Sequence, residues 1–238
     1  FSGDVFVADC GSNLLHRKKL LGGQIQFKAE RPGDERDREF LASTDNWFRP
    51  VQMEVGPDGA LYIADMYREV IEHPWSLPQG IKQHIDLDSG NDRGRIYRVV
   101  PEAFVQPKTP LLGQQTTAEL VLMLDHPNGW HRNTAARLLY ERQDTAAVEP
   151  LRLLVSHGQT GHGRMHSLYV LAGLGALKRS DLVKATVDAS PLVRMHAIRL
   201  AEQFLSRHSA RFVGSTADNL PLMQNLLRIA DDLDLNVR

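Results

Sequence analysis

The sequence contains a single cysteine, Cys10, among 238 residues. One thiol excludes an internal disulfide, and it excludes a Cys-x-x-Cys-His haem attachment site within these residues. No apolar run approaches the roughly 20 residues needed to cross a bilayer. The 28 basic and 29 acidic residues nearly balance, which gives no electrostatic reason to expect nucleic acid or an anionic membrane as a partner. These absences leave a globular protein as the natural interpretation. Its length and its 42% hydrophobic residues predict two domains, each with its own core.

The first 100 residues consist of short apolar segments separated by turn residues, which is the pattern of β-strands. The turn sequence Pro57-Asp58-Gly59 predicts that the strands at 51–55 and 61–64 are antiparallel neighbours. The stretches "VFVAD" (5–9) and "LYIAD" (61–65) both end on an aspartate, at an offset of 65 − 9 = 56 residues. This offset fits a four-stranded propeller blade with one enlarged loop. We therefore expect part of a β-propeller over residues 1–100, with strands at 5–8, 24–28, 51–55, 61–64 and 95–99.

A proline-rich segment follows the β half. Pro101, Pro107 and Pro110 interrupt both strand and helix patterns and predict a linker over 101–116. From about Thr117 the apolar residues recur with helical spacing, and Pro191 after Ser190 has the chemistry of a helix start. The residues with this spacing are Val193, Ala197, Leu200, Ala201 and Phe204, and then Leu222, Leu226, Ile229 and Ala230.

Arginines recur along the helical half. Arg132, Arg164 and Arg194 are spaced by 32 and 30 residues, a period typical of stacked helical hairpins. We therefore expect an α-solenoid of HEAT-like repeats over 117–238, in which these arginines pair with acids such as Asp125 and Asp188. The histidines and glycines of segment 156–167 do not have the spacing of a two-histidine zinc motif and predict an inter-helix loop.

Four segments together resemble a known family: "NWFRPVQMEVGPDGALYIADMYREVIEHPWSLP" (46–78), "DRGRIYRVVP" (92–101), "HPNGWHRNTAARLL" (126–139) and "GRMHSLYVLAGLGAL" (163–177). They are similar to the planctomycete-type membrane-bound dehydrogenases. In that family a propeller like that of the glucose and sorbosone dehydrogenases, which use pyrroloquinoline quinone (PQQ), precedes HEAT repeats and often a c-type haem domain. The resemblance implies a fold of two domains, the last blades of a propeller followed by the start of the solenoid.

The resemblance also implies a cellular context. It suggests a periplasmic, cell-envelope or extracellular oxidoreductase that uses PQQ and Ca²⁺, with haem c only in a domain outside this chain. The sequence opens on Phe1 rather than on a methionine and a leader, so we expect a fragment that is inactive alone. The implied substrate is a sugar or alcohol, or a polysaccharide.

Two segments of the β half are expected to meet at the mouth of the propeller. Segment 43–49 leads into one strand and the loop 66–91 leaves the next, so their side chains should gather on one face. Loops of this length are commonly functional. The candidates are His73, Arg49 and Tyr67 as catalytic residues, Arg49, Arg68 and Trp47 as cofactor-binding residues, and Asp65 and Glu72 as metal ligands.

Each candidate also has a structural interpretation, and the sequence leaves both open. Asp9 and Asp65 can cap the turns after their strands, and His73 can tie its loop by a hydrogen bond. Arg49 can pair with an acid of a neighbouring blade, and Trp47 can simply pack. The first hypothesis is therefore a dehydrogenase with His73 as the base. The alternative is a non-catalytic propeller and HEAT-repeat module that binds a polysaccharide or a protein.

Overall fold

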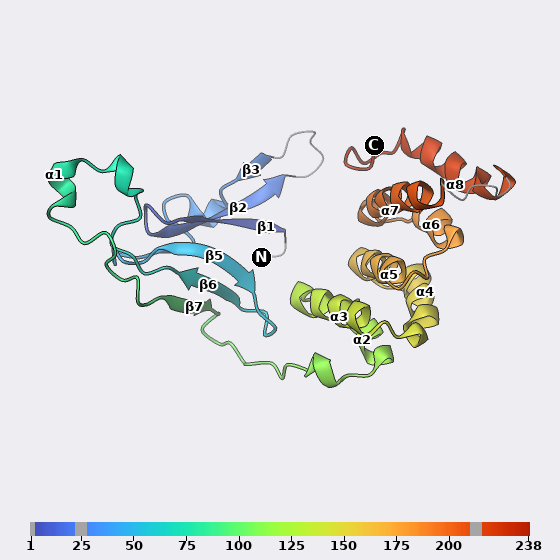
Figure 1. The fold of residues 1–238 in the computed structure, drawn as a ribbon, viewed down its shortest axis with the longest axis horizontal. Helices are drawn as coiled ribbons and strands as arrows, with labels where there is room; N and C mark the ends of the chain where they lie inside the picture. The colour runs from blue at the N-terminus through green and yellow to red at the C-terminus, as the bar shows by residue number, and fades with distance from the viewer. Residues whose placement is uncertain (1–2, 22–27, 210–215) are drawn as a thin grey trace. The chain divides into compact units, whose positions relative to one another are not determined.

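The computed structural model describes residues 3–21, 28–209 and 216–238, and the chain divides into two compact units, Phe1–Lys108 and Thr109–Arg238 (Figure 1). The division falls inside segment 101–116, where the three prolines predict a linker. The first unit is built from strands and the second from helices. None of the helices in the described ranges is long and apolar enough to span a membrane.

The β unit contains two antiparallel sheets. In the first, the order is β1 (Asp4–Asp9), β2 (Leu14–Leu21) and β3 (Lys28–Glu30), and β4 (Leu41–Ala42) also pairs with β2. In the second, the order is β5 (Pro50–Val55), β6 (Leu61–Asp65) and β7 (Arg95–Val99). Two short 3₁₀ segments, Gly33–Glu35 and Pro74–Ser76, and the short helix α1 (Gln79–Lys82) lie in the connections.

The predicted hairpin between β5 and β6 is confirmed. Val55 pairs with Leu61, and the Gly56 amide donates to the Ala60 carbonyl at 2.9 Å. Gly59 has φ of +82°, a left-handed conformation that suits glycine. The strand expected at 24–28 lies outside the described residues except for Lys28, which begins β3.

The two sheets share a small core. Leu15 of β2, Ile63 of β6 and Phe48, which lies just before β5, are buried together, and β1 contacts β5. Two neighbouring propeller blades would share a core in this way, but no ring of blades closes within the described residues. The β-propeller therefore stays a prediction.

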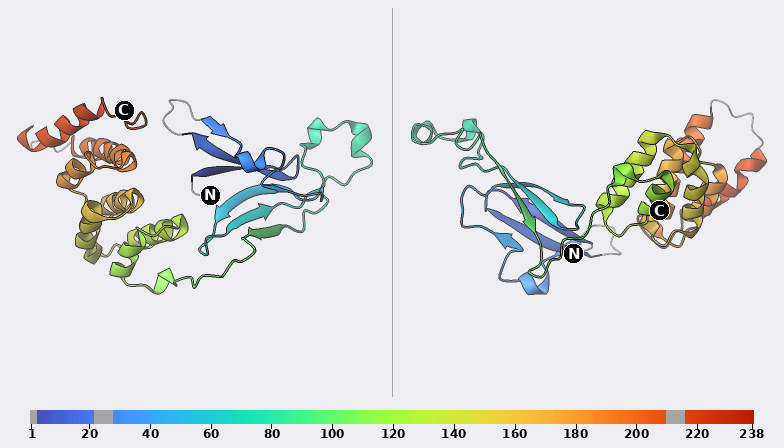
Figure 2. Two further views of the ribbon diagram at one scale, coloured as in Figure 1. Left: turned by 180° about the vertical axis from the view of Figure 1, so that it is seen from behind. Right: turned by 90° about the horizontal axis from the view of Figure 1, so that it is seen from below.

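A long connection joins β6 to β7. It carries the 3₁₀ segment Pro74–Ser76 and α1, and it extends away from the strand ends (Figures 1 and 2). This connection contains most of the residues that the sequence singles out as a candidate site.

The helical unit contains paired helices in two rows. The helices are α2 (Thr117–Met123), α3 (Gly129–Arg142), α4 (Val148–His157), α5 (Gly161–Gly173), α6 (Arg179–Ala185), α7 (Pro191–Ser209) and α8 (Thr216–Ile229), with 3₁₀ segments Leu112–Gln114 and Thr145–Ala147. Helix α5 contacts both α3 and α7 in one row, and α2, α4, α6 and α8 form the other (Figure 2). One continuous apolar core lies between the rows. The helical unit is thus built from stacked helical hairpins, and their assignment as HEAT-like repeats stays a prediction.

Helix starts in this unit follow local capping chemistry. Thr116 and Glu119 form a capping box at α2, and Asn128 caps α3. Helix α7 begins at Pro191 as predicted, and Val193, Ala197, Leu200 and Ala201 are buried. The side chain of Phe204 lies outside the described part. Leu222 and Ile229 of α8 are buried and Leu226 packs against the core, whereas Ala230 lies beyond the helix and is exposed.

The predicted loop at 156–167 is wrong in its second half. Thr160 accepts a hydrogen bond from the Gly163 amide at 2.9 Å and caps α5, so the glycine-rich stretch forms the first helical turn. A side chain at Gly163 would collide with the Asp125 carboxylate, so the glycine provides room for packing. His162 and His166 therefore lie one turn apart on α5.

Candidate functional site

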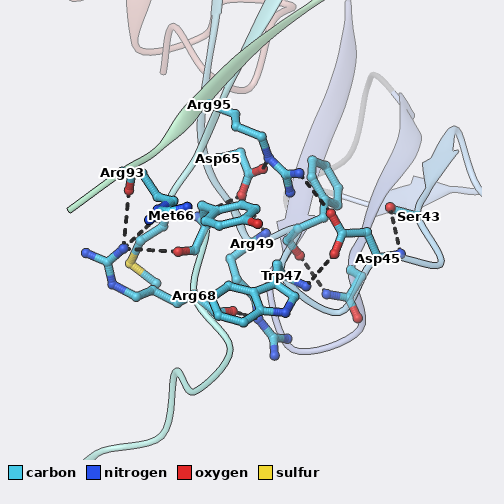
Figure 3. A network of polar contacts seen from close by, with 12 residues as sticks. Ser43, Asp45, Trp47, Arg49, Asp65, Met66, Arg68, Arg93 and Arg95 are labelled. Atoms are coloured by element: carbon cyan, nitrogen blue, oxygen red, sulfur yellow. Dashed lines mark hydrogen bonds and ion pairs between the residues drawn. The ribbon is translucent and has the colours of Figure 1, made fainter. Parts of the chain in front are cut away.

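Asp65, at the end of β6, is the centre of a buried polar cluster and is only 3% exposed. Its Oδ1 accepts hydrogen bonds from the backbone amides of Arg49 at 2.8 Å and Tyr67 at 2.9 Å. Its Oδ2 accepts one from Arg95 Nε at 2.6 Å (Figure 3). Both carboxylate oxygens are therefore occupied by donors of this chain, and one donor carries a positive charge.

Arg95, at the start of β7, joins Asp65 to a second acid. Its Nη1 lies 2.8 Å from Asp45 Oδ2, and its guanidinium lies 4.2 Å from the centre of the Tyr67 ring. Burial opposes the charge on Arg95, but the hydrogen bonds to Asp45 and Asp65 outweigh that effect and raise its pKa. The pKa of Asp45 is lowered by the Trp47 amide and then by Arg95. Asp45, Asp65 and Arg95 therefore form a charged cluster beside the Tyr67 ring, and this cluster holds the ends of β6 and β7 together.

The guanidinium of Arg49 forms hydrogen bonds with two turns, the one that follows β1 and the one that follows β6. Its Nε donates to the Arg68 carbonyl at 2.9 Å, Nη2 to the Glu69 carbonyl at 2.7 Å and Nη1 to the Cys10 carbonyl at 2.9 Å. All three guanidinium nitrogens thus bind backbone oxygens of this chain. A side chain used in this way holds loops in place and does not present an open fork to a substrate or a quinone.

Arg68 plays a similar role in the loop that follows Asp65. Its Nη1 donates to the carbonyls of Met66 and Tyr67, both at 3.0 Å, and to that of Gly90. Tyr67 has φ of +55°, and its ring packs against Trp47 with centroids 5.0 Å apart. A side chain at Gly90 would collide with the Tyr67 carbonyl. The two ends of the 66–91 loop are therefore fixed against each other.

His73 and Glu72 lie farther along the loop and are exposed. His73 Nδ1 accepts a hydrogen bond from the Trp75 amide at 3.2 Å, and Glu72 accepts one from the Ile71 amide at 3.2 Å. Among the described residues, no hydrogen bond or ion pair connects either side chain to Asp65. The structure thus brings together Asp65, Arg49, Tyr67, Arg68 and Trp47, and it leaves His73 and Glu72 outside that cluster.

The donor set of the cluster does not fit Ca²⁺ or a quinone. Calcium needs six to eight oxygen ligands, whereas the Asp65 oxygens already accept three hydrogen bonds and face Arg95. In the described part of the chain, no three His, Cys, Asp or Glu residues are grouped so as to hold a metal. Arg49 and Arg68 direct their donors at carbonyl groups. The arrangement can position loops, and it supports no chemical step through either cofactor.

Sequence reasoning missed two members of this cluster, Asp45 and Arg95. Arg95 pairs directly with Asp65 in the register of β6 and β7. An antiparallel alignment of "LYIAD" with "RIYRV" would have placed the two residues opposite each other. The signal was therefore present in the strand pairing rather than in either segment alone.

Comparisons with known proteins concern the β unit. Residues 1–103 match a family described as a domain of unknown function, DUF7133. No curated protein matches the chain. No solved structure matches it either. The chain is therefore similar to DUF7133 over nearly all of its β unit, and this similarity carries no activity with it.

Proposed function

We propose that this chain is a binding module in which the β unit presents an anchored loop to a polysaccharide or protein partner. The proposal is supported by the hydrogen-bond partners of the polar side chains in the cluster. Asp65, Arg49 and Arg68 direct their hydrogen-bonding atoms at the backbone or at Arg95. Their combined effect is to fix both ends of the loop.

The loop held in this way exposes an aromatic and apolar surface. Trp75 is 90% exposed, and Ile81 on α1 is also exposed. Large aromatic side chains are enriched where proteins contact partners, and a fixed loop lowers the entropy cost of binding. His73 orients the Trp75 backbone through its Nδ1 acceptor. A scaffold with an exposed tryptophan is better suited to binding than to proton abstraction.

Binding is tested by fluorescence titration of the whole chain with soluble polysaccharides: dextran, pullulan and polygalacturonate. We expect at least one of them to change the tryptophan emission, and we expect Trp75→Ala to weaken that binding at least tenfold. Trp47→Phe keeps a ring in the cluster and serves as the matched control. If no polysaccharide binds, an affinity-purified partner from the native host replaces it, and Trp75→Ala must then reduce its capture.

The dehydrogenase hypothesis is tested in parallel. The same chain is incubated with PQQ and Ca²⁺, and dye reduction is followed over a panel of sugars and alcohols. Turnover that is lost in His73→Ala, together with unchanged binding in Trp75→Ala, would overturn the binding proposal and favour the enzyme.

A further inference from the structure

Three arginines occupy equivalent positions in the helical unit. Arg132, Arg164 and Arg194 are each the fourth residue of their helix, in α3, α5 and α7. Each donates Nη1 to the carbonyl six residues earlier, at 2.7, 2.7 and 2.8 Å. This shared contact fixes the guanidinium in the same way in all three repeats.

The other two nitrogens bind a carboxylate in two of the repeats. Arg164 Nε and Nη2 contact the oxygens of Asp188 at 2.7 and 2.8 Å. Arg194 Nε and Nη2 contact the oxygens of Asp232, both at 2.7 Å. In each case the aspartate comes from the next repeat, so the arginine forms a two-pronged ion pair of the strong kind.

The guanidinium of Arg132 makes the same contact through Nη1, but no carboxylate in the described part of the chain contacts its Nε and Nη2. Its Nε is buried without a hydrogen-bond partner, and among the described residues no hydrogen bond or ion pair is seen for its Nη2. The reason lies in the next repeat, because Gly158 stands six residues before Arg164, where Asp188 stands six residues before Arg194. A glycine has no carboxylate to offer.

Asp125 does not replace the missing carboxylate. Its oxygens accept hydrogen bonds from the amides of Gln159 at 2.7 Å and Thr160 at 3.0 Å, and from the Thr160 hydroxyl. No ion pair within 4.0 Å joins it to Arg132, although its charge acts on that residue. Burial lowers the pKa of Arg132 against the influence of Asp125.

The surroundings of Arg132 add further donors. His162 and His166 lie on α5 and His196 lies on α7, where its Nδ1 is 2.8 Å from the Tyr169 hydroxyl. Burial, Arg132 and the neighbouring histidines lower the pKa of His166 to about 4. Burial and then Arg132 lower the pKa of His162, and burial and Arg199 lower that of His196. No carboxylate contributes to any of these shifts.

Acidic residues are scarce on this row of helices. Over the described parts of α3, α5 and α7 the acids are Glu141, which pairs with Arg137 on the same helix at 3.0 Å, and the exposed Glu202. Asp188 and Asp232 compensate the charges of Arg164 and Arg194, whereas no carboxylate of the described ranges contacts the guanidinium of Arg132, and this favours an anionic partner at Arg132.

We propose that Arg132 Nη2, with the ring of His162, binds an aspartate or glutamate of an acidic peptide segment that lies across α3 and α5. The ligand carboxylate binds Nη2, which is one of the two nitrogens that bind Asp188 and Asp232 in the other two repeats, where the bound group is likewise a side chain of a polypeptide. The proposal deepens the binding function proposed above, at a site that is independent of Trp75.

The experiment measures binding of a fluorescein-labelled hexa-aspartate peptide to the full chain by fluorescence anisotropy at low ionic strength. A hexa-asparagine peptide is the neutral control, and hexagalacturonate competes as an acidic sugar. We expect the aspartate peptide to bind, the asparagine peptide not to bind, and Arg132→Gln to weaken binding at least tenfold. Arg137→Gln removes the same charge from an exposed position of α3 and should change the affinity less than twofold.

Two further variants test the geometry. Arg132→Lys keeps the charge but loses the fork, so it should bind more weakly than the wild type and more tightly than Arg132→Gln. His162→Gln replaces the imidazole with a neutral amide and should weaken binding less than Arg132→Gln does, because it leaves the guanidinium in place.

Several outcomes would overturn the proposal. One is an equal loss of affinity in Arg132→Gln and Arg137→Gln, which would mean unspecific attraction. Another is tighter binding of hexagalacturonate than of the peptide, which would make the ligand a sugar. Circular dichroism of each variant confirms that it is folded, and Arg132→Lys replaces Arg132→Gln if the latter is not. Failure here with intact Trp75-dependent binding leaves the proposed function standing.

Discussion

Replacing Asp65 with asparagine is the sharpest test of the polar cluster in the β unit. Asparagine keeps an oxygen for the amides of Arg49 and Tyr67, but it loses the charge and turns an N–H group toward Arg95. Removing one partner of a buried ion pair costs about 3–5 kcal/mol. Arg95 keeps Asp45 as a partner, so we expect the lower end of that range, about 3 kcal/mol. This is a large part of the roughly 5–15 kcal/mol that stabilises a typical domain.

The measurement needs a signal from the β unit alone, because two units need not unfold together. In a Trp75→Phe/Trp130→Phe background the remaining tryptophan is Trp47, which contacts Tyr67 beside the cluster. Urea unfolding followed by its fluorescence then gives the free energy of unfolding of the β unit.

Asp9 provides a matched control because it also ends a strand. Its Oδ1 accepts one hydrogen bond, from the exposed Ser12 amide at 3.0 Å, and that amide is the main cause of its lowered pKa. Asp9→Asn should therefore lower the stability of the β unit much less than Asp65→Asn does. A loss below about 1 kcal/mol in Asp65→Asn, or an equal loss in Asp9→Asn, would refute the view that the charged contact with Arg95 stabilises this unit.

Three further predictions concern other parts of the molecule. Gly90→Ala should lower the β-unit midpoint in urea far more than Gly59→Ala, because both have positive φ but only Gly90 lies against the Tyr67 carbonyl; equal losses would contradict this. The pKa of His166 is lowered in the folded state to about 4, so the unfolded state binds the proton first and the helical unit should lose stability as the pH falls from about 6.5 towards 4. His166→Gln should flatten that loss in thermal melts followed by circular dichroism, and an unchanged pH profile would refute it. Arg164→Met should cost the helical unit about 3 kcal/mol in urea unfolding, because it leaves a carboxylate of the next repeat without its ion pair; a loss below about 1 kcal/mol would contradict a stabilising role of the arginine–aspartate pairs between repeats.

The sequence predicts those elements whose signals are local. The hairpin from β5 to β6 follows from its turn, and the start of α7 follows from Pro191. Strand β2 was not predicted because the basic residues in "LLHRKKLL" hide its alternating pattern. In the structure, Leu15 and Arg17 are both buried. Arg17 is buried against Asp4 and Glu35, and an inward arginine conceals the alternation on which strand prediction depends.

The candidate site was predictable only in part, for a related reason. Asp65, Arg49 and Tyr67 are close in sequence to recognisable turns, and the structure does bring them together. Their role depends on Arg95, which lies 30 residues from Asp65 and meets it through strand pairing. From the local sequence alone, Asp65 looks like a carboxylate that is available to bind a ligand. Its ion pair with Arg95 shows that it instead has a structural role.

The two strand ends that repeat in the sequence are connected through one side chain. Asp9 caps its own turn, and the carbonyl of the next residue, Cys10, accepts a hydrogen bond from Arg49. The backbone amide of Arg49 in turn donates to Asp65. Arg49 therefore ties the turn after β1 to the turn after β6, so the repeated aspartates mark where two sheets are fastened. Because these hydrogen bonds use backbone carbonyls, they constrain the course of the loops more than their side chains. Loop residues beyond them, such as Trp75, therefore stay exposed, as the proposed binding function requires.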